Sequence, residues 1–415
     1  MLRYLVQVTE DLLAAALVLG LLWARVSLTD PDRGQRTLAW GAGLGTAAAA
    51  LMAYMKNTTA KVNTGTWNLR IFTVCLLALA VYLAVTLPPL RKARWSAAAA
   101  RYSAAVLAFL YLFYALPNDL AYPFTFSLNG ESVFSTAYLY RLIGWVLGFV
   151  LMLLLFSAVR ASARRMGVHT AGRLLNTVLL INAVQQAAKG VQILLARRAI
   201  PSSRALFQFA RYTSNYSDWF LYAAMLLALP MAVVLWVRSY RAREPYENPA
   251  QHRKLRAAWR SARRWSALMA CCFLAAVLNL TVVDAYNNRP VQLSPVEESE
   301  VRGENVYVSL EPLEDGHLHR FAYTTEGGVD VRFIVVKKPG ASSYGVGLDA
   351  CDICGETGYY ERSGQVICKL CDVVMNINTI GFKGGCNPIV LDYSVEGGYI
   401  VIPVSALVEN EKEFK

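Results

Sequence analysis

The sequence predicts an α-helical polytopic membrane domain of about eight spans, followed by a small β-rich metal-binding domain with zinc-ribbon-like CxxC knuckles. Three observations support this prediction: an apolar composition, a series of apolar runs of bilayer length, and paired cysteines after the last run. Of the 415 residues, 55% are hydrophobic and 17% are charged, and the mean hydropathy is +0.34. Soluble chains of this length carry more charge, so composition alone favours the bilayer.

The apolar runs define the membrane part. A helix needs about 20 apolar residues to cross the hydrocarbon core. By that measure there are eight candidate spans, at residues 4–26, 37–55, 70–88, 97–116, 140–159, 174–195, 217–237 and 267–285. We therefore expect a transmembrane domain at 1–286, a linker at 287–304 and a β-rich domain at 305–415. The first run is long and no small-residue cleavage site follows it, so we interpret it as a span.

The charges are divided unequally along the chain. Before Pro295 there are 31 Lys/Arg and 10 Asp/Glu, and from Pro295 onward there are 10 and 19. The excess basic residues gather in short loops beside apolar runs, for example Arg91 and Lys92, as expected when they set membrane orientation. This distribution predicts a multi-pass protein of the bacterial cytoplasmic membrane with an extracytoplasmic C-terminal domain; one miscounted span would reverse the side. No nucleic-acid partner is needed to explain the basic balance.

Polar residues inside the spans are the first candidate site. Asn182, Gln185, Lys189 and Gln192 follow one another at offsets of three, four and three, which places them on one helix face. Polar groups are costly within the bilayer and tend to be functional there. We predict a polar site formed by this face and Glu10 of the first span, with Glu10 pairing with Lys189. The alternative is a structural polar seam, or side chains that reach to the interface.

The composition changes after Tyr286. Residues 306–310, 318–323 and 329–336 have the pattern of short strands, and a last hairpin at 389–404 turns at Glu396-Gly-Gly398. Because so small a domain has a limited hydrophobic core, a bound metal would be a natural supplement to its stability.

Cysteines provide the strongest chemical signal. Cys351-Asp-Ile-Cys354 and Cys368-Lys-Leu-Cys371 are two CxxC pairs separated by 13 residues, and Cys386 follows. Two CxxC turns complete a tetrahedral set of four thiolates, which suits Zn²⁺ and iron–sulfur clusters alike. We predict these four as metal ligands, with Cys386 as a fifth ligand, a resolving thiol or a spare, and His319 as a further candidate.

Two other readings of the cysteines stay open. An extracytoplasmic domain favours disulfides, so the pairs could staple the fold. A CxxC pair can also be a redox dithiol, although the usual βαβ context of such a motif is not apparent.

The same residues carry a resemblance. Asp315–Phe321, Tyr344–Gly355, Gly358–Tyr360, Cys368–Asp372 and Asn376–Pro388 together resemble the family of membrane iron–sulfur-containing proteins called FtrD-like. In the membrane half the likeness rests only on a similar multi-span arrangement.

This resemblance implies a part in iron uptake, beside an Ftr-type iron permease and periplasmic metal-binding proteins, with electron handling around iron oxidation. It also implies that the five cysteines are the ligands of an iron–sulfur cluster or of a metal ion. Because such clusters are normally built in the cytosol, an exported module leaves three alternatives: an inverted topology, another assembly route, or a site for Zn²⁺, mononuclear iron or copper.

The leading hypothesis is therefore an electron-transfer or metal-handling component of a bacterial iron-uptake system. One alternative is a metal-ion transporter that uses the polar face in its spans and a structural zinc module; another is a thiol–disulfide oxidoreductase. With four histidines in the chain, and no Ser/His/Asp set or phosphate loop, an electron-transfer or metal-binding protein is favoured over an enzyme.

Overall fold

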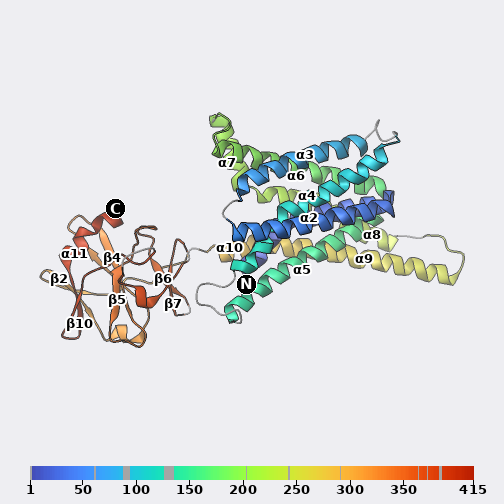
Figure 1. Cartoon of the computed structure of the whole chain (residues 1–415). Coiled ribbons are helices and arrows are strands. Elements are labelled where there is room, and N and C mark those ends of the chain that lie inside the picture. Colours follow the sequence, from blue (N-terminus) through green and yellow to red (C-terminus); the bar gives the residue numbers. More distant parts are fainter. Residues whose placement is uncertain are drawn as a thin grey trace. The chain divides into compact units, whose positions relative to one another are not determined.

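A computed structural model describes residues 2–59, 62–86, 94–125, 135–201, 203–241, 244–289, 291–362, 364–371, 373–382 and 386–415. Arg91 and Lys92 of the predicted basic loop, and Asp372, Gly384 and Gly385 of the cysteine-rich motif, lie outside these residues. The chain divides into two compact units, Met1–Asn288 and Arg289–Lys415 (Figure 1). The first is helical and the second is rich in β-strands.

The described part of the first unit contains eight helices long and apolar enough to cross a membrane. The prediction of eight spans is thereby confirmed. These helices are α1 (Leu2–Thr29), α2 (Arg33–Thr58), α3 (Thr64–Thr86), α4 (Ser96–Thr125), α5 (Thr136–Arg165), α6 (Val168–Ala196), α8 (Asp218–Arg241) and α9 (Pro249–Leu278), the last continuing through a π-turn (Asn279–Val283) into α10 (Asp284–Asn287).

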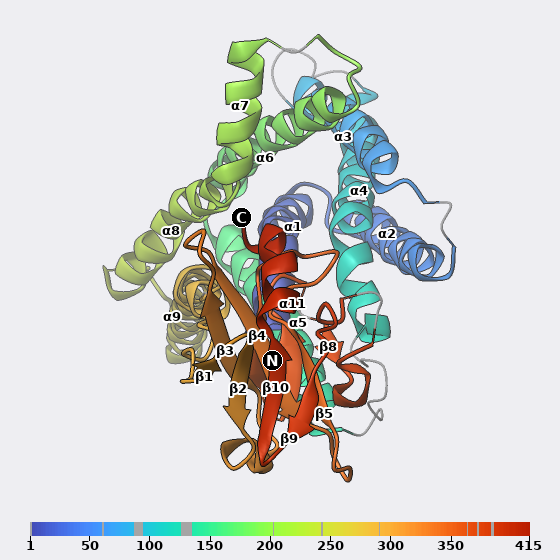
Figure 2. The ribbon, with the colours of Figure 1, turned by 90° about the vertical axis from the view of Figure 1, so that its left-hand side faces the viewer.

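Helix α1 lies inside the bundle. Its most apolar window is 72% buried, against 28–50% for the other candidate spans, and Figure 2 shows it surrounded by its neighbours.

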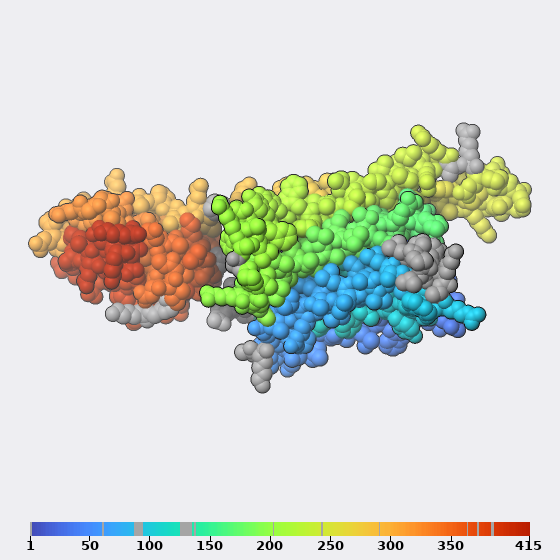
Figure 3. All heavy atoms as spheres, turned by 90° about the horizontal axis from the view of Figure 1, so that it is seen from above, coloured from blue at the N-terminus to red at the C-terminus, as the bar shows by residue number. Residues whose placement is uncertain are grey.

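Small residues allow the helices to pack closely. A Cβ atom added at Gly148 of α5 would lie only 2.7 Å from the Val8 Cβ of α1. Gly41 and Gly45 of α2 likewise lie directly against the backbone of α4. Transmembrane helices associate without a hydrophobic driving force, and small residues at their interfaces let the backbones come into close van der Waals contact. In Figure 3 the green α6 and the blue α3 run side by side.

Three helical features differ from the expectation. Between the sixth and seventh spans the chain forms α7 (Arg204–Asn215), a helix of 12 residues that is too short to cross a bilayer. Helix α9 begins at Pro249, capped by the Asn248 side chain, rather than at residue 267. The segment between the predicted spans 217–237 and 267–285 is therefore largely helical. Helix α4 continues through Pro117 and Pro123 to Thr125, which places Asp119 inside a helix.

The described residues of the second unit form three antiparallel sheets. The four-stranded sheet has the order β1-β2-β10-β9, and the others are β3-β4-β5 and β6-β7-β8. The strands are β1 (Glu300–Arg302), β2 (Asn305–Ser309), β3 (His319–Thr324), β4 (Asp330–Lys337), β5 (Tyr344–Leu348), β6 (Tyr359–Arg362), β7 (Gln365–Cys368), β8 (Val374–Met375), β9 (Ser394–Glu396) and β10 (Tyr399–Pro403).

The predicted strands at 306–310, 318–323 and 329–336 correspond to β2, β3 and β4, and the final hairpin turns between β9 and β10 as expected. The strands β5 to β8 were not predicted. Strand β4 separates two hydrophobic clusters by its alternation: Phe333 and Val335 face the larger one, whereas Ile334 and Val336 face a smaller one that includes Cys351 and Cys368. The cysteines thus lie at the edge of a small core of their own.

A buried ion pair joins the elements around this smaller core. The Arg320 Nε of β3 donates to Asp349 Oδ2 at 2.8 Å, and the two side chains are 1% and 0% exposed. The other Asp349 oxygen accepts the Tyr359 N–H of β6 at 2.8 Å. Arg320 also donates to the Tyr359 carbonyl and, at 2.6 Å, to Ser294. The buried charges are therefore both paired and hydrogen-bonded.

Replacing Asp349 by Asn should lower the free energy of unfolding of the second unit by about 3–5 kcal/mol, because the Arg320 charge would stay buried without its partner. The measurement is denaturant unfolding of the full chain in detergent, monitored by hydrogen exchange of the backbone amides in β3 to β6. Asp392, which is exposed, provides the control Asp392→Asn; equal effects of the two substitutions would contradict a structural role for the pair.

Candidate metal centre

The first CxxC turn follows β5. Cys351 and Gly355 exchange two backbone hydrogen bonds, of 3.2 and 2.9 Å, across the turn. Gly355 has φ +65°, a conformation that glycine adopts without steric cost. The Cys354 N–H donates to the Cys351 sulfur at 3.1 Å. The turn therefore directs both sulfurs and a backbone donor to one side.

The second CxxC turn follows β7. Cys368 ends that strand opposite Tyr359 of β6, and its N–H donates to the Val373 carbonyl at 3.1 Å. The backbone N–H groups of Leu370 and Cys371 point to the Cys368 sulfur. Backbone donors of this kind stabilise a thiolate, so the two turns have the same local chemistry.

A loop after β8 brings in Cys386. Its neighbours are held against β5, since a Cβ at Gly345 would lie 2.9 Å from Ile380 and one at Gly347 would lie 2.8 Å from Pro388. The Tyr359 hydroxyl donates to the Cys386 carbonyl at 2.6 Å. Gly345 and Gly347 thus let the loop pack directly on β5. This close packing accounts for glycines in a strand where alternating apolar side chains would be expected.

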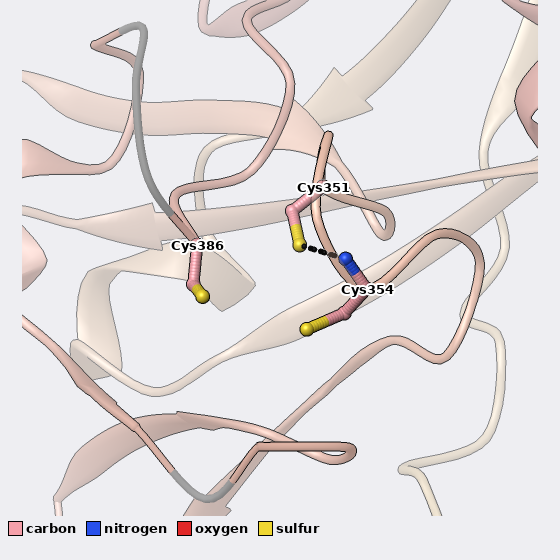
Figure 4. Close-up of side chains that lie close together, drawn as sticks. All are labelled: Cys351, Cys354 and Cys386. Atoms are coloured by element: carbon pink, nitrogen blue, oxygen red, sulfur yellow. Dashed lines mark hydrogen bonds between the residues drawn. The ribbon is translucent and has the colours of Figure 1, made fainter. Parts of the chain in front are cut away.

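The five cysteines converge. Cys351, Cys354 and Cys386 form one group and Cys354, Cys368 and Cys371 a second, each with its sulfurs within 4.8 Å of one another. Figure 4 shows the first group with its thiols turned toward a common space. The sulfurs of Cys371 and Cys386 are 3.7 Å apart, close to the spacing of about 3.8 Å in a tetrahedral site with bonds of about 2.3 Å. Cys354 belongs to both groups, which are able to bind a metal ion.

The donor set indicates which metals suit the site. Within the described residues the groups consist of cysteines alone, and all eight cysteines of the chain are free thiols. Thiolates select Zn²⁺, Cu(I) and iron–sulfur clusters, whereas Ca²⁺ and Mg²⁺ require oxygen ligands. The residues present therefore fit an iron–sulfur cluster or a single thiolate-bound ion.

The thiol pKa values differ within the cluster. Burial raises the pKa of Cys354 and Cys368, and a hydrogen bond with Cys371 raises the pKa of Cys386. Burial alone would raise the pKa of Cys371, but the Val373 N–H and the neighbouring thiols lower it below its ordinary value. Metal binding would displace the remaining protons, so it is coupled to proton release.

Residues 313–414 match a family model described as membrane iron-sulfur containing protein FtrD-like. This match lies within the C-terminal unit and covers less than half of the chain. The matched segment includes all five clustered cysteines and excludes the helices of the first unit. Comparison with curated proteins and with solved structures gave no match.

His319 of the C-terminal unit is held by carboxylates. Its Nδ1 lies 2.9 Å from a Glu297 oxygen and its Nε2 lies 3.0 Å from an Asp315 oxygen. Among the described residues, the metal-capable groups do not include it. Burial would lower the pKa of His319, but the hydrogen bonds to Asp315 and Glu297 raise it above its ordinary value. In this arrangement His319 links the segment before β1 to β3.

The raised pKa predicts a pH dependence. The charged form of His319 stabilises the folded domain fully below its unfolded-state pKa of about 6.5, and the contribution is lost as the pH rises through the higher folded-state pKa. Hydrogen exchange in β3 of the full chain should therefore become faster above neutral pH than intrinsic exchange alone requires. His319→Gln should remove this extra pH dependence; a variant with the same profile as the unmodified chain would show that His319 is not responsible.

The polar face of α6 is engaged in packing. Gln185 donates to the Ser217 carbonyl at 3.3 Å, and Gln192 donates to Ala210 and Thr213 of α7 at 3.1 and 3.0 Å. Asn182 donates to the Val178 carbonyl of its own helix at 2.9 Å. Two of the predicted residues thus fasten α7 and the start of α8 to α6.

Glu10 and Lys189 do not form an ion pair in the part of the chain that the structure describes. The Lys189 Nζ lies 3.5 Å from the Tyr114 hydroxyl and 5.9 Å from the centre of its ring. Lys189 is still within electrostatic range of Glu10 and Asp11. Glu10 and Lys189 therefore lie near each other without the predicted ion pair.

Asp119 is a residue that the sequence pattern did not reveal. It is 0% exposed, and neither carboxylate oxygen has a hydrogen-bond partner among the described residues. The Trp145 indole N–H donates to the backbone carbonyl of Asp119 at 2.7 Å. Asp11 lies within electrostatic range of the Asp119 side chain. The predicted span ended at residue 116, so Asp119 fell outside it, whereas α4 continues through Pro117 to Thr125.

Proposed function

We propose that this chain is a membrane-anchored metal protein of a bacterial iron-uptake system, and that the cysteine cluster is its electron-transfer centre. The observation that carries the proposal is the convergence of five thiols from two CxxC turns and a loop. The match to an FtrD-like family model over the same residues supports an iron-related group.

Cys351, Cys354, Cys368 and Cys371, together with Cys386, would hold the group. An iron–sulfur cluster is the first choice because of the family description, and mononuclear iron, Zn²⁺ or copper are the alternatives. Iron in such a site supplies one-electron chemistry, with a potential set by thiolates, hydrogen bonds to sulfur and solvent exposure. Among the described residues, the N–H groups of Cys354, Leu370, Cys371 and Val373 are donors to the cluster sulfurs.

The exposed side of the cluster supports exchange of electrons with a partner. Cys351 and Cys368 are buried, but Cys371 is exposed. The apolar side chains between the paired cysteines, Ile353 and Leu370, are 68% and 63% exposed. An apolar surface beside an accessible centre suits a transient partner, which we propose to be an Ftr-type permease or a periplasmic metal-binding protein.

We propose the bacterial cytoplasmic membrane as the location, with the C-terminal unit on the extracytoplasmic side. The support is the excess of basic residues in loops on the opposite side of the eight-span arrangement.

The first test is anaerobic purification of the full chain, with measurement of metal, acid-labile sulfide and the visible spectrum. We expect iron, with sulfide for a cluster, and absorbance that bleaches on reduction. Cys354→Ser should lower the bound metal most, at least tenfold, because Cys354 belongs to both thiol groups. Cys271→Ser, at an exposed cysteine of α9, should leave it unchanged.

Zinc alone would exclude electron transfer by this centre. Disulfides without metal would instead favour a thiol–disulfide oxidoreductase.

A second candidate function, metal-ion transport through the bundle, is favoured by Asp119. A buried carboxylate without a partner inside a membrane span is costly and is characteristic of ion pathways. Under this proposal Glu10 and Asp11 would lie on the same path, and the cysteine module would be structural.

If the chain conducts metal ions, Asp119→Asn should lower Fe²⁺ uptake by proteoliposomes at least tenfold while leaving the metal content of the cysteine module unchanged. Asp32→Asn, at an exposed position in the connection between α1 and α2, is the control. Absence of Fe²⁺ uptake by the unmodified chain, or equal uptake by both variants, would remove the transporter proposal.

A further inference from the structure

A hollow of about 580 Å³ lies between the last turns of α5 and the helix α9. Its lining residues are Ser157, Arg160, Ala161, Arg164, Arg165 and Trp265. All belong to the first unit, and none of them is a proposed metal ligand or a member of the proposed ion path. The lining contains three guanidinium groups and no carboxylate.

The three arginines are oriented by neighbours without being neutralised. The Arg160 guanidinium lies 5.3 Å from the centre of the Trp23 ring. Arg165 donates to the Ala161 carbonyl at 2.7 Å and to the Ser261 hydroxyl at 3.0 Å. In the described part of the chain, none of the three forms an ion pair with Asp or Glu.

The electrostatic surroundings are repulsive. The charge that acts on both Arg160 and Arg165 is that of Arg164. Like charges within one helix turn destabilise each other, although the C-terminal end of a helix favours cations. The C-terminal end of the helix explains why arginines are tolerated here. It does not explain why three arginines, a hydroxyl and an indole line a hollow between two helices. An anion in the hollow would relieve the repulsion.

The position in the bundle indicates the kind of anion. The arginines occupy the end of a 30-residue helix that contains a candidate span, so they lie near the boundary of the hydrocarbon core. Trp265 of the neighbouring helix lines the same hollow, and tryptophan is enriched at the level of the lipid headgroups. Guanidinium forks match phosphate oxygens with paired hydrogen bonds.

We infer that this hollow binds the phosphate of an anionic phospholipid headgroup. Arg164 and Arg165 would contact the phosphate oxygens, with Arg160 fixed beside them against Trp23 and the Ser157 hydroxyl available as a further donor. Basic pockets between membrane helices are a recurring way to hold anionic headgroups. Inorganic phosphate is also an anion whose oxygens accept hydrogen bonds, but it lacks the acyl chains that would lie along the helices.

The test uses the full chain in nanodiscs of equal phosphatidylglycerol and phosphatidylcholine, followed by native mass spectrometry of retained lipid. We expect selective retention of phosphatidylglycerol by the unmodified chain. Each arginine near the membrane surface contributes about fivefold in affinity, so Arg164→Gln/Arg165→Gln should weaken retention by roughly 25-fold. The control Arg253→Gln/Arg256→Gln removes the same charge from exposed positions of α9 and should have little effect.

Three outcomes would overturn the inference. Equal loss in both double variants would mean a diffuse electrostatic attraction rather than a site. Equal retention of phosphatidylcholine would mean that the anionic headgroup is not recognised. Displacement of the lipid by millimolar inorganic phosphate would assign the hollow to a free anion. Circular dichroism of each variant checks that its helices are intact.

Discussion

The carboxylate of Asp349 is the constraint on which the cysteine cluster depends. It is fully buried and joins Arg320 of β3 to the Tyr359 N–H of β6. The same tyrosine reaches the Cys386 carbonyl through its hydroxyl, and Cys351 follows Asp349 by two residues. One ion pair therefore places three separate chain segments around a common point. The thiols themselves would repel one another as thiolates, so their convergence needs this support and, we propose, a metal cation.

Much of this arrangement could be predicted from sequence, because it depends on local patterns. The eight apolar runs have the length that the bilayer requires, and all eight form helices. The CxxC pairs place two sulfurs together by their spacing alone. By contrast, β5 has glycines where a strand pattern needs side chains, and its identity follows from the loop that packs on it. The fit of Cys386 likewise depends on contacts distant in sequence.

The charged groups of the membrane unit were harder to anticipate. The helical spacing of Gln185 and Gln192 predicted a shared face, but it could not distinguish an ion path from the packing of α7 against α6, and α7 itself was not predicted. Asp119 fell outside the predicted span, which ended at residue 116, whereas α4 continues to Thr125. The sequence shows the arginines at the end of α5 only as basic residues beside an apolar run, and the neighbouring α9 gives them a shared hollow. In each case the partner lies far away in the chain.

X-ray absorption at the metal edge of the purified, reduced full chain tests the central claim most directly. If the five cysteines form the metal centre, the first shell will contain sulfur alone, with bonds of about 2.3 Å. A second scattering shell from a neighbouring iron would identify a cluster, and its absence a single ion. A first shell of nitrogen and oxygen would contradict the claim, because it would place the metal outside the thiol groups.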